Sequence, residues 1–327
     1  MIVEHPDVPP GRILAAVRDE WGIGADTVER LELPREGWHW LVGDGDGPQW
    51  LASVDLAAAA ERRQRTAAFE CAAMLRQNLG FVLAPVYTRD ARITVELPAG
   101  LQLSLTPYLD RRSAGRGGFA DDAQRSVVAG MLGALHRQPR PRRAPVWRPR
   151  VGRGPAAGRE DLERVLDRDR CSGGPWSEPA GRLVRPARYA VRRALRRFDL
   201  LGAAVVGSAD RWVLTHGRPG TDHLVDTPDG PRLTGWETLA FAPRERDLGD
   251  VLGAAEDPEP WFAYVEAGGR PDPLSSDTVE LFALERHLTT VAELAVRFCR
   301  PHGDSADERR RFAELEESLT AVQERWG

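Results

Sequence analysis

The sequence predicts an α+β fold with two lobes, a small lobe built on an antiparallel sheet and a larger lobe made mainly of helices. Through the first 110 residues, short runs of apolar and β-branched residues alternate with turn signals around one long helical stretch. Beyond residue 110, the apolar residues recur mostly with helical spacing. A chain of 327 residues, 42% of them hydrophobic, is long enough to bury a core in each lobe.

The small lobe is expected over residues 1–110. Helices are predicted at 10–21 and 57–79, because apolar side chains recur there along one helical face. A turn rich in glycine and aspartate at 43–48 predicts a hairpin. Five strands are predicted, at 38–42, 50–54, 81–86, 93–97 and 101–105.

The large lobe is expected over residues 111–327. A strand pair is predicted from 213–214, 224–225 and 233. Pro186 leaves open whether the helix predicted at 178–200 is continuous or broken. Helices are predicted at 121–135, 159–169, 178–200, 248–252, 260–266, 278–298 and 306–326.

The cationic residues of the chain are all arginines. There are 45 of them against 49 acidic residues, and lysine is absent. Seven arginines fall between 137 and 153, where the prolines exclude a regular helix, so an extended basic loop is expected. A basic stripe is predicted on one helix from Arg185, Arg188, Arg192 and Arg196. These two features either attract an acidic ligand or are solvated faces of the protein.

Neither the cysteines nor the apolar runs predict an extracytoplasmic protein. Cys71, Cys171 and Cys299 show no metal-ligand or CxxC spacing, so we expect no zinc site and reduced thiols, with Cys71 and Cys299 in helix cores. The first residues are acidic and broken by proline, and no apolar run is long enough to span a membrane. We therefore expect a cytoplasmic protein that does not enter a membrane.

A resemblance to a known family is carried by residues 212–238. Their order is His216-Gly217-Arg218, four residues, His223, a strand, a turn, a second strand and then Gly235-Trp236. This segment resembles the catalytic loop and metal-binding strand of the aminoglycoside phosphotransferase family, with the pattern His-Gly-Asp(or Glu)-x-x-x-x-Asn and, further on, Asp-Trp. Segments 173–179, 242–248 and 298–302 resemble actinobacterial members. The resemblance implies a bilobal, protein-kinase-like fold.

The residues that carry the family's chemistry are changed. Arg218 stands where the resemblance implies the catalytic acid, His223 where it implies asparagine, and Gly235 where it implies the magnesium-binding aspartate. The lysine that grips nucleotide phosphates in kinase folds is missing as well. His216 and Asp247 are retained, and both are expected to serve the structure of the loop. We therefore expect no magnesium-ATP cofactor, identify no other, and predict a pseudokinase.

The candidate catalytic residues are Arg218, His223, Asp222 and Glu237. Arg218 is expected to lie buried at the base of the cleft between the lobes. A buried guanidinium needs a partner, so Arg218 either binds an anion with its planar guanidinium or makes an internal salt bridge with Glu237 or Asp222. The carboxylates of Asp222, Asp226 and Glu237 either form a displaced metal site or solvate and cap the loops. No metal ligands are assigned. His223 beside Asp222 has the chemistry of an acid or base near neutral pH.

The candidate ligand-binding residues surround the expected cleft between the lobes. They are Tyr108 in the hinge, Glu70 on the helix 57–79, and Arg188 and Arg192 on the basic stripe. The expected ligand is an anionic small molecule or an acidic peptide. No nucleic-acid-binding motif is present, so nucleic acid is not the expected partner. A role in a biosynthetic pathway is a further expectation. The alternative function is an active, atypical phosphotransferase, or another transferase or lyase that uses the altered residues. The oligomeric state stays open.

Overall fold

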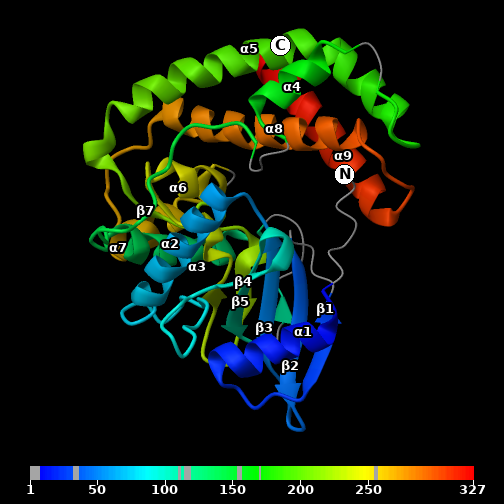
Figure 1. The fold of residues 1–327 in the computed structure, drawn as a ribbon. Helices are drawn as coiled ribbons and strands as arrows, with labels where there is room; N and C mark the ends of the chain where they lie inside the picture. The colour runs from blue at the N-terminus through cyan, green and yellow to red at the C-terminus, as the bar shows by residue number, and fades with distance from the viewer. Residues whose placement is uncertain are drawn as a thin grey trace. The chain divides into compact units, whose positions relative to one another are not determined.

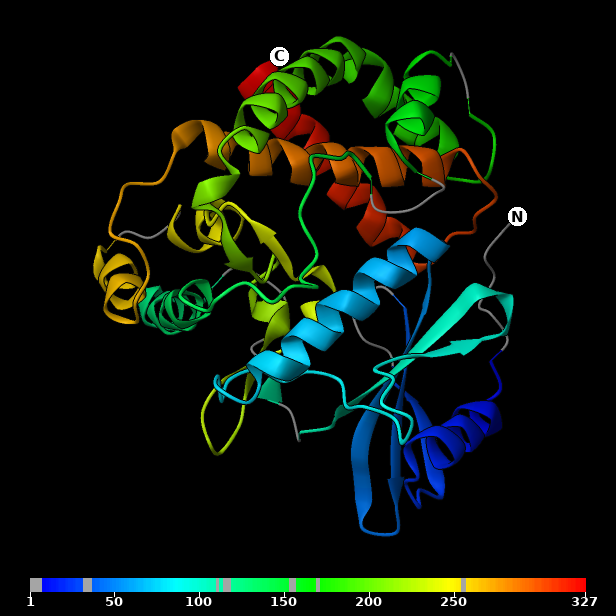
Figure 2. The same cartoon turned by 60° about the vertical axis from the view of Figure 1, so that its left-hand side comes forward.

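The computed structural model describes residues 8–31, 37–109, 112–113, 119–152, 157–168, 171–253 and 257–327. The chain forms two compact units, which we describe separately (Figures 1 and 2). The sheet unit is built from His5–Trp147 and Trp212–Pro273, and the helical unit from Arg148–Arg211 and Leu274–Gly327. The lobe boundary expected at residue 110 lies outside the described residues and stays a prediction.

The sheet unit begins with a five-stranded antiparallel sheet in the order β1-β2-β3-β5-β4. Its strands are β1 (Thr27–Leu31), β2 (Trp38–Asp44), β3 (Gly47–Leu56), β4 (Val95–Leu97) and β5 (Leu101–Pro107). Helix α1 (Pro10–Ala16) and the π-helical turn Val17–Trp21 cover one face. Ile13, Val17 and Trp21 pack there against strand residues such as Val54 and Leu103.

Helix α2 (Ala59–Leu75) contacts the opposite face of the sheet. Side chains alternate between the two faces of a strand, so Asp55 of β3 and Gln102 of β5 point away from the α1 core. Asp55 forms an ion pair with Arg65 at 3.2 Å, and Gln102 donates to Thr66 at 3.0 Å. Polar contacts therefore join α2 to the sheet.

The prediction of five strands is confirmed in number but wrong in one member. Residues 81–86 form no strand of the sheet, and the fifth strand is β1. Val82 instead makes an isolated parallel bridge with Leu233, and Pro85 has no N–H to donate to a ladder. β1 is largely exposed, so its sequence lacks the apolar alternation that marks a half-buried strand.

The rest of the sheet unit surrounds two short sheets. β7 (Val213–Thr215) pairs with β10 (Ala240–Ala242), while β8 (Leu224–Asp226) pairs with β6 (Arg112–Ser113) and β9 (Arg232–Leu233). The predicted pairing of 224–225 with 233 is confirmed, whereas 213–214 pairs with β10. Three helices complete the unit, α3 (Asp122–His136), α6 (Glu245–Leu252) and α7 (Glu259–Glu266), with α3 packed against both of the others and against β7.

The helical unit contains α4 (Arg159–Leu166), α5 (Ser177–Val206), α8 (Ser276–Phe298) and α9 (Ala306–Trp326). Each of α5, α8 and α9 packs against the other two, and α4 packs mainly on α8. α5 is one continuous helix with Pro186 inside it. None of the described helices in either unit is long and apolar enough to cross a membrane.

The expectation of three reduced cysteines is wrong. Cys171 and Cys299 form a disulfide with 4.8 Å between their Cα atoms. The two cysteines are 128 residues apart in the sequence, so local spacing could not show that they are close in the structure. Cys299 is the C-cap of α8 and is partly exposed, whereas Cys71 is buried in α2 as predicted.

Candidate functional site

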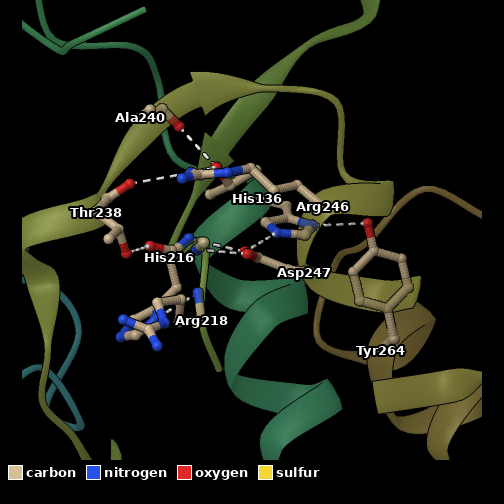
Figure 3. Close-up of polar contacts among 10 residues, drawn as sticks. His136, His216, Arg218, Thr238, Ala240, Arg246, Asp247 and Tyr264 are labelled. Atoms are coloured by element: carbon tan, nitrogen blue, oxygen red, sulfur yellow. Dashed lines mark hydrogen bonds and ion pairs between the residues drawn. The ribbon is translucent and has the colours of Figure 1, made fainter. Parts of the chain in front are cut away.

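The loop that follows β7 is fixed by one buried carboxylate. Asp247, fully buried at the start of α6, accepts the backbone N–H groups of His216 at 2.8 Å and Gly217 at 2.6 Å. His136 of α3 lies 3.1 Å from the same carboxylate through Nε2 (Figure 3). Its Nδ1 lies 3.1 Å from the hydroxyl of Tyr264. A chain of polar contacts therefore runs from α7 through α3 to the loop.

The pKa of Asp247 reflects these contacts. Burial alone raises the pKa of this carboxyl, but the hydrogen bond and charge of His136, with the charge of Arg246, bring the pKa below its usual value. The carboxylate is therefore ionised at neutral pH. An ionised carboxylate accepts these N–H groups more strongly than a neutral acceptor would.

His216 is a neutral structural residue in this arrangement. Its Nε2 donates to the carbonyl of Thr234 at 2.8 Å, and its Nδ1 accepts the N–H of Arg218 at 3.2 Å. Complete burial lowers the pKa of the imidazole. Both nitrogens are engaged by backbone groups, so the prediction that His216 and Asp247 hold the loop structure is confirmed.

Arg246 is a further support that the sequence did not single out. Its Nη1 donates to Thr215 Oγ1 at 2.9 Å and to the carbonyl of Thr238 at 3.0 Å, which joins β7 to the turn before β10. Gly217 has φ of +95°, and a Cβ there would lie 2.5 Å from the Arg246 guanidinium.

The sequence also gave no signal for His136 or Tyr264, because both lie far from the motif along the chain.

His223 occupies the space that a side chain at position 235 would need. The imidazole is only 3% exposed, and its ring centroid lies 5.7 Å from that of His216. Gly235 has φ of +80°, and a Cβ built on it would lie 2.1 Å from His223 Nδ1. Glycine is therefore required at 235 both by the backbone conformation and by the neighbouring imidazole.

The side chains at positions 223 and 235 are poor ligands for magnesium. Magnesium prefers oxygen ligands in an octahedral arrangement, and Gly235 and His223 supply none through their side chains. Among the described residues, no group of three or more His, Cys, Asp or Glu side chains is arranged to hold a metal ion. The metal that kinase folds use does not fit the substituted positions.

Of the four candidate catalytic residues, the structure joins His223 to Asp222. His223 Nε2 lies 3.4 Å from Asp222 Oδ2, and the carboxylate is 40% exposed. Glu237 lies on the 3₁₀ turn Trp236–Thr238, and its negative charge acts to raise the pKa of His216. Both carboxylates thus lie near the two histidines.

Arg218 is exposed, contrary to the expectation that its guanidinium lies buried at the base of a cleft. Its backbone N–H binds His216, while its side chain extends away from Asp247 (Figure 3). An exposed guanidinium keeps most of its hydration, so the energetic argument for a compulsory partner does not apply. Its position on the loop still makes it accessible to a ligand.

Glu70 and Tyr108 lie in the sheet unit. Burial first, and then the charge of Glu70, raise the pKa of Tyr87, which places Glu70 near Tyr87. Tyr108 follows β5 and donates its backbone N–H to the carbonyl of Gln49 at 2.8 Å. Glu70 is not the residue of α2 that pairs with β3, since the ion pair between these two elements is Arg65–Asp55.

Arg188 and Arg192 lie on α5 in the helical unit. The guanidinium of Arg188 lies over the Tyr189 ring, 4.9 Å from its centroid, and Arg192 forms an ion pair with Asp167. Their contribution to a site with Arg218 stays a prediction. The predicted basic loop is non-helical over its described part, and Arg140 lies over the ring of Phe241 of β10 at 4.5 Å.

Comparisons with known proteins place this architecture beside small-molecule kinases. No family model matches the chain. Protein StrN of Streptomyces griseus is 25% identical over 288 residues, which cover 86% of this chain and 82% of StrN. A spectinomycin phosphotransferase, solved with ADP and spectinomycin, matches 97% of this chain and 99% of its own at a TM-score of 0.70 and 12% identity. A microcompartment-associated aminopropanol kinase matches 95% of this chain and 96% of its own at a TM-score of 0.61 and 16% identity.

Proposed function

We propose that this chain, which has the bilobal α+β fold of the aminoglycoside phosphotransferases and related kinases, is a pseudokinase that binds an anionic ligand in place of magnesium-ATP. The fold confirms the resemblance read from the sequence. The ligand is a small molecule that carries phosphate or carboxylate groups, or an acidic peptide. Its contact on the loop is the guanidinium of Arg218.

The observation that carries this proposal is the packing of His223 on Gly235. In kinase folds, carboxylate and amide side chains hold magnesium, which bridges the nucleotide phosphates. Here the imidazole of His223 lies where a side chain at 235 would have to pass, 2.1 Å from the position of its Cβ. The two substitutions support each other sterically, so restoring aspartate at 235 alone would not restore a metal ligand.

The contact between α2 and the sheet supports the same proposal. Protein kinases pair a strand lysine with a helix glutamate, and the lysine also holds nucleotide phosphates. In this chain, β3 supplies a carboxylate, Asp55, and α2 supplies the guanidinium of Arg65. The polarity of this pair is reversed, so β3 itself supplies no cation for a nucleotide phosphate there.

The exposed side chain of Arg218 gives the loop an anion-binding group. Arginine presents several N–H donors in one plane, which matches the oxygens of a carboxylate or phosphate. The solved spectinomycin phosphotransferase binds ADP. We propose that the ligand of this chain places its anionic group near Arg218 without a metal ion.

Thermal-shift measurements with a panel of anions test this function. ATP with and without magnesium, sugar phosphates, dicarboxylates and an acidic peptide are compared for the wild type, Arg218→Ala and the control Arg63→Ala. Arg63 is an exposed arginine on α2 of the same unit. We expect at least one anion to stabilise the wild type and Arg63→Ala but not Arg218→Ala. If no anion does so, or if Arg218→Ala responds fully, the proposed ligand class is wrong.

A magnesium-dependent response to ATP would favour the alternative function. Hydrolysis of ATP that is lost in Glu237→Ala would indicate a displaced metal site in an active phosphotransferase. Turnover that depends on His223 but not on magnesium would indicate another transferase or a lyase.

A further inference from the structure

We infer that the disulfide between Cys171 and Cys299 is a thiol-exchange site, with an adjoining pocket that favours a small anionic thiol. The site lies wholly within the helical unit and is independent of the proposed function of the sheet unit. The observations that carry the inference are a pocket lined by both cysteines and by two arginines, and a network of hydrogen bonds that fixes both cysteine-bearing segments.

The pocket adjoins both sulfur-bearing residues. It opens to solvent, and its enclosed part is only large enough for water. Val165, Val184 and Phe298 provide apolar wall, while Arg168 and Arg185 bring two guanidinium-bearing side chains to the same space. Cys171 and Cys299 are themselves partly exposed. A small thiol would therefore approach the disulfide from solvent, at the mouth of the pocket.

The charges around the pocket favour a negatively charged thiol over a neutral one. Arg168 is exposed, and Arg185 is half-buried with an ion pair to Glu178 at 3.2 Å. Guanidinium groups attract carboxylates and also stabilise the thiolate form of a nearby cysteine. A thiol with a carboxylate close to its sulfur carries both groups that these guanidinium groups attract, the carboxylate and the thiolate.

The two cysteine-bearing segments are held together by more than the disulfide. Ser177 Oγ accepts the N–H groups of Gly173 and Gly174 at 2.8 and 3.0 Å and donates to the carbonyl of Phe298 at 2.7 Å. His302 adds a backbone bond to the carbonyl of Gly173 at 3.1 Å and accepts the Trp176 N–H at 3.1 Å. These bonds do not depend on the oxidation state of sulfur. The thiols would remain neighbours after reduction, which makes the exchange reversible.

The exchange consumes two equivalents of the small thiol. Its thiolate attacks Sγ of Cys299, the Cys171–Cys299 bond breaks, and Cys171 leaves as a thiolate that takes up a proton. A second thiolate then attacks the small thiol's sulfur in the mixed disulfide, which frees Cys299 and releases the oxidised small-molecule disulfide. Cys171 is the better leaving group, because Cys299 caps the C-terminus of α8, where the helix dipole disfavours negative charge.

Cys71 provides an internal comparison. It is buried in α2, and burial raises the pKa of its thiol to about 12. A thiol of this kind is almost wholly protonated near neutral pH and is unreactive. Alkylation of the native reduced protein should therefore mark Cys171 and Cys299 and leave Cys71 unmodified.

The experiment compares the opening of the disulfide by thioglycolate and by 2-mercaptoethanol in the native protein. Alkylation at timed intervals, followed by mass spectrometry of peptides, gives one rate constant for each thiol. Their ratio, compared between variants, cancels the intrinsic reactivity of the two reagents. We expect Arg168→Ala and Arg185→Ala each to lower the ratio of anionic to neutral rate by about fivefold, since one guanidinium is removed. Arg193→Ala, an exposed arginine on α5 outside the pocket lining, should keep the wild-type ratio.

Acid quenching of the thioglycolate reaction should trap the mixed disulfide on Cys299. Three results would overturn the inference. They are a ratio unchanged in both pocket variants, a disulfide that opens only in denaturant, and a purified protein whose Cys171 and Cys299 resist oxidation to the disulfide.

Discussion

The contact between His223 and Gly235 is the residue-scale feature that most separates this chain from a metal-dependent kinase. Gly235 has a positive φ and lies against the imidazole, so a Cβ at this position meets both backbone strain and a steric overlap. The steric overlap depends on the imidazole of His223 and the backbone strain does not, so the two effects can be measured separately.

A double-mutant cycle separates the strain from the overlap. We expect Gly235→Ala to lower the free energy of unfolding by about 2–4 kcal/mol in the wild type, since strain and overpacking act together. In the His223→Ala background the same change should cost only about 1–2 kcal/mol, because the ring is gone and the strain remains. Urea denaturation gives both values. Equal costs in the two backgrounds would show that His223 does not fill the space at 235.

The buried His216 makes stability depend on pH. Its pKa is lowered in the folded state, so below the unfolded value of 6.5 the unfolded chain binds a proton that the folded chain does not. The resulting stability is complete above pH 6.5 and is lost as the pH falls below it, by up to about 1.4 kcal/mol per pH unit. The pKa of Asp247 is also lowered, but its contribution is lost only below the unfolded value of 3.8.

Denaturation curves between pH 7 and 5 check this effect. His216→Gln removes the titrating ring, so its stability should change less over this interval than that of the wild type. Parallel pH profiles for the two proteins would rule out His216 as the source.

At the scale of elements, α5 combines a long continuous helix with a proline in its interior. Pro186 cannot donate to the carbonyl of Arg182, and its ring crowds that turn. The side chain is exposed, so its removal leaves no cavity. We expect Pro186→Ala to raise the free energy of unfolding by about 1–3 kcal/mol. A decrease in stability on calorimetric melting would show that the proline is needed for a bend in α5.

The elements also show which structural features a sequence can reveal. Most helices are predictable because their apolar residues recur on one face, and the hairpin of β2 and β3 follows from its turn residues. β1 escapes this reading because it is mostly exposed. Residues 82–84 are apolar because they are buried, and the backbone of residues 81–83 pairs with Leu233, which is far away in sequence.

The candidate site was predictable only where its residues are adjacent in the chain. The motif located His216, Arg218, His223 and Gly235, but not His136, Arg246 or Tyr264, which reach the loop from α3, α6 and α7. The sequence could not show that Arg218 is exposed, since exposure depends on how the loop packs. The disulfide was hidden by the 128 residues between its cysteines.

At the scale of the whole molecule, the fold of a phosphotransferase is retained around a loop with altered chemistry. Asp247, His136 and Tyr264 keep the loop anchored to three helices, while the positions facing the expected metal carry an imidazole and a glycine. We expect that this architecture does not engage magnesium-ATP.

Isothermal titration calorimetry of the purified wild-type protein with magnesium-ATP tests this expectation. Titrations with and without magnesium, at the same ATP concentrations, distinguish a metal-dependent complex from simple anion binding at Arg218. We expect no magnesium-dependent heat, and any weak heat should be the same without the metal. A micromolar affinity for ATP that appears only with magnesium would show that the protein still has a functional metal site.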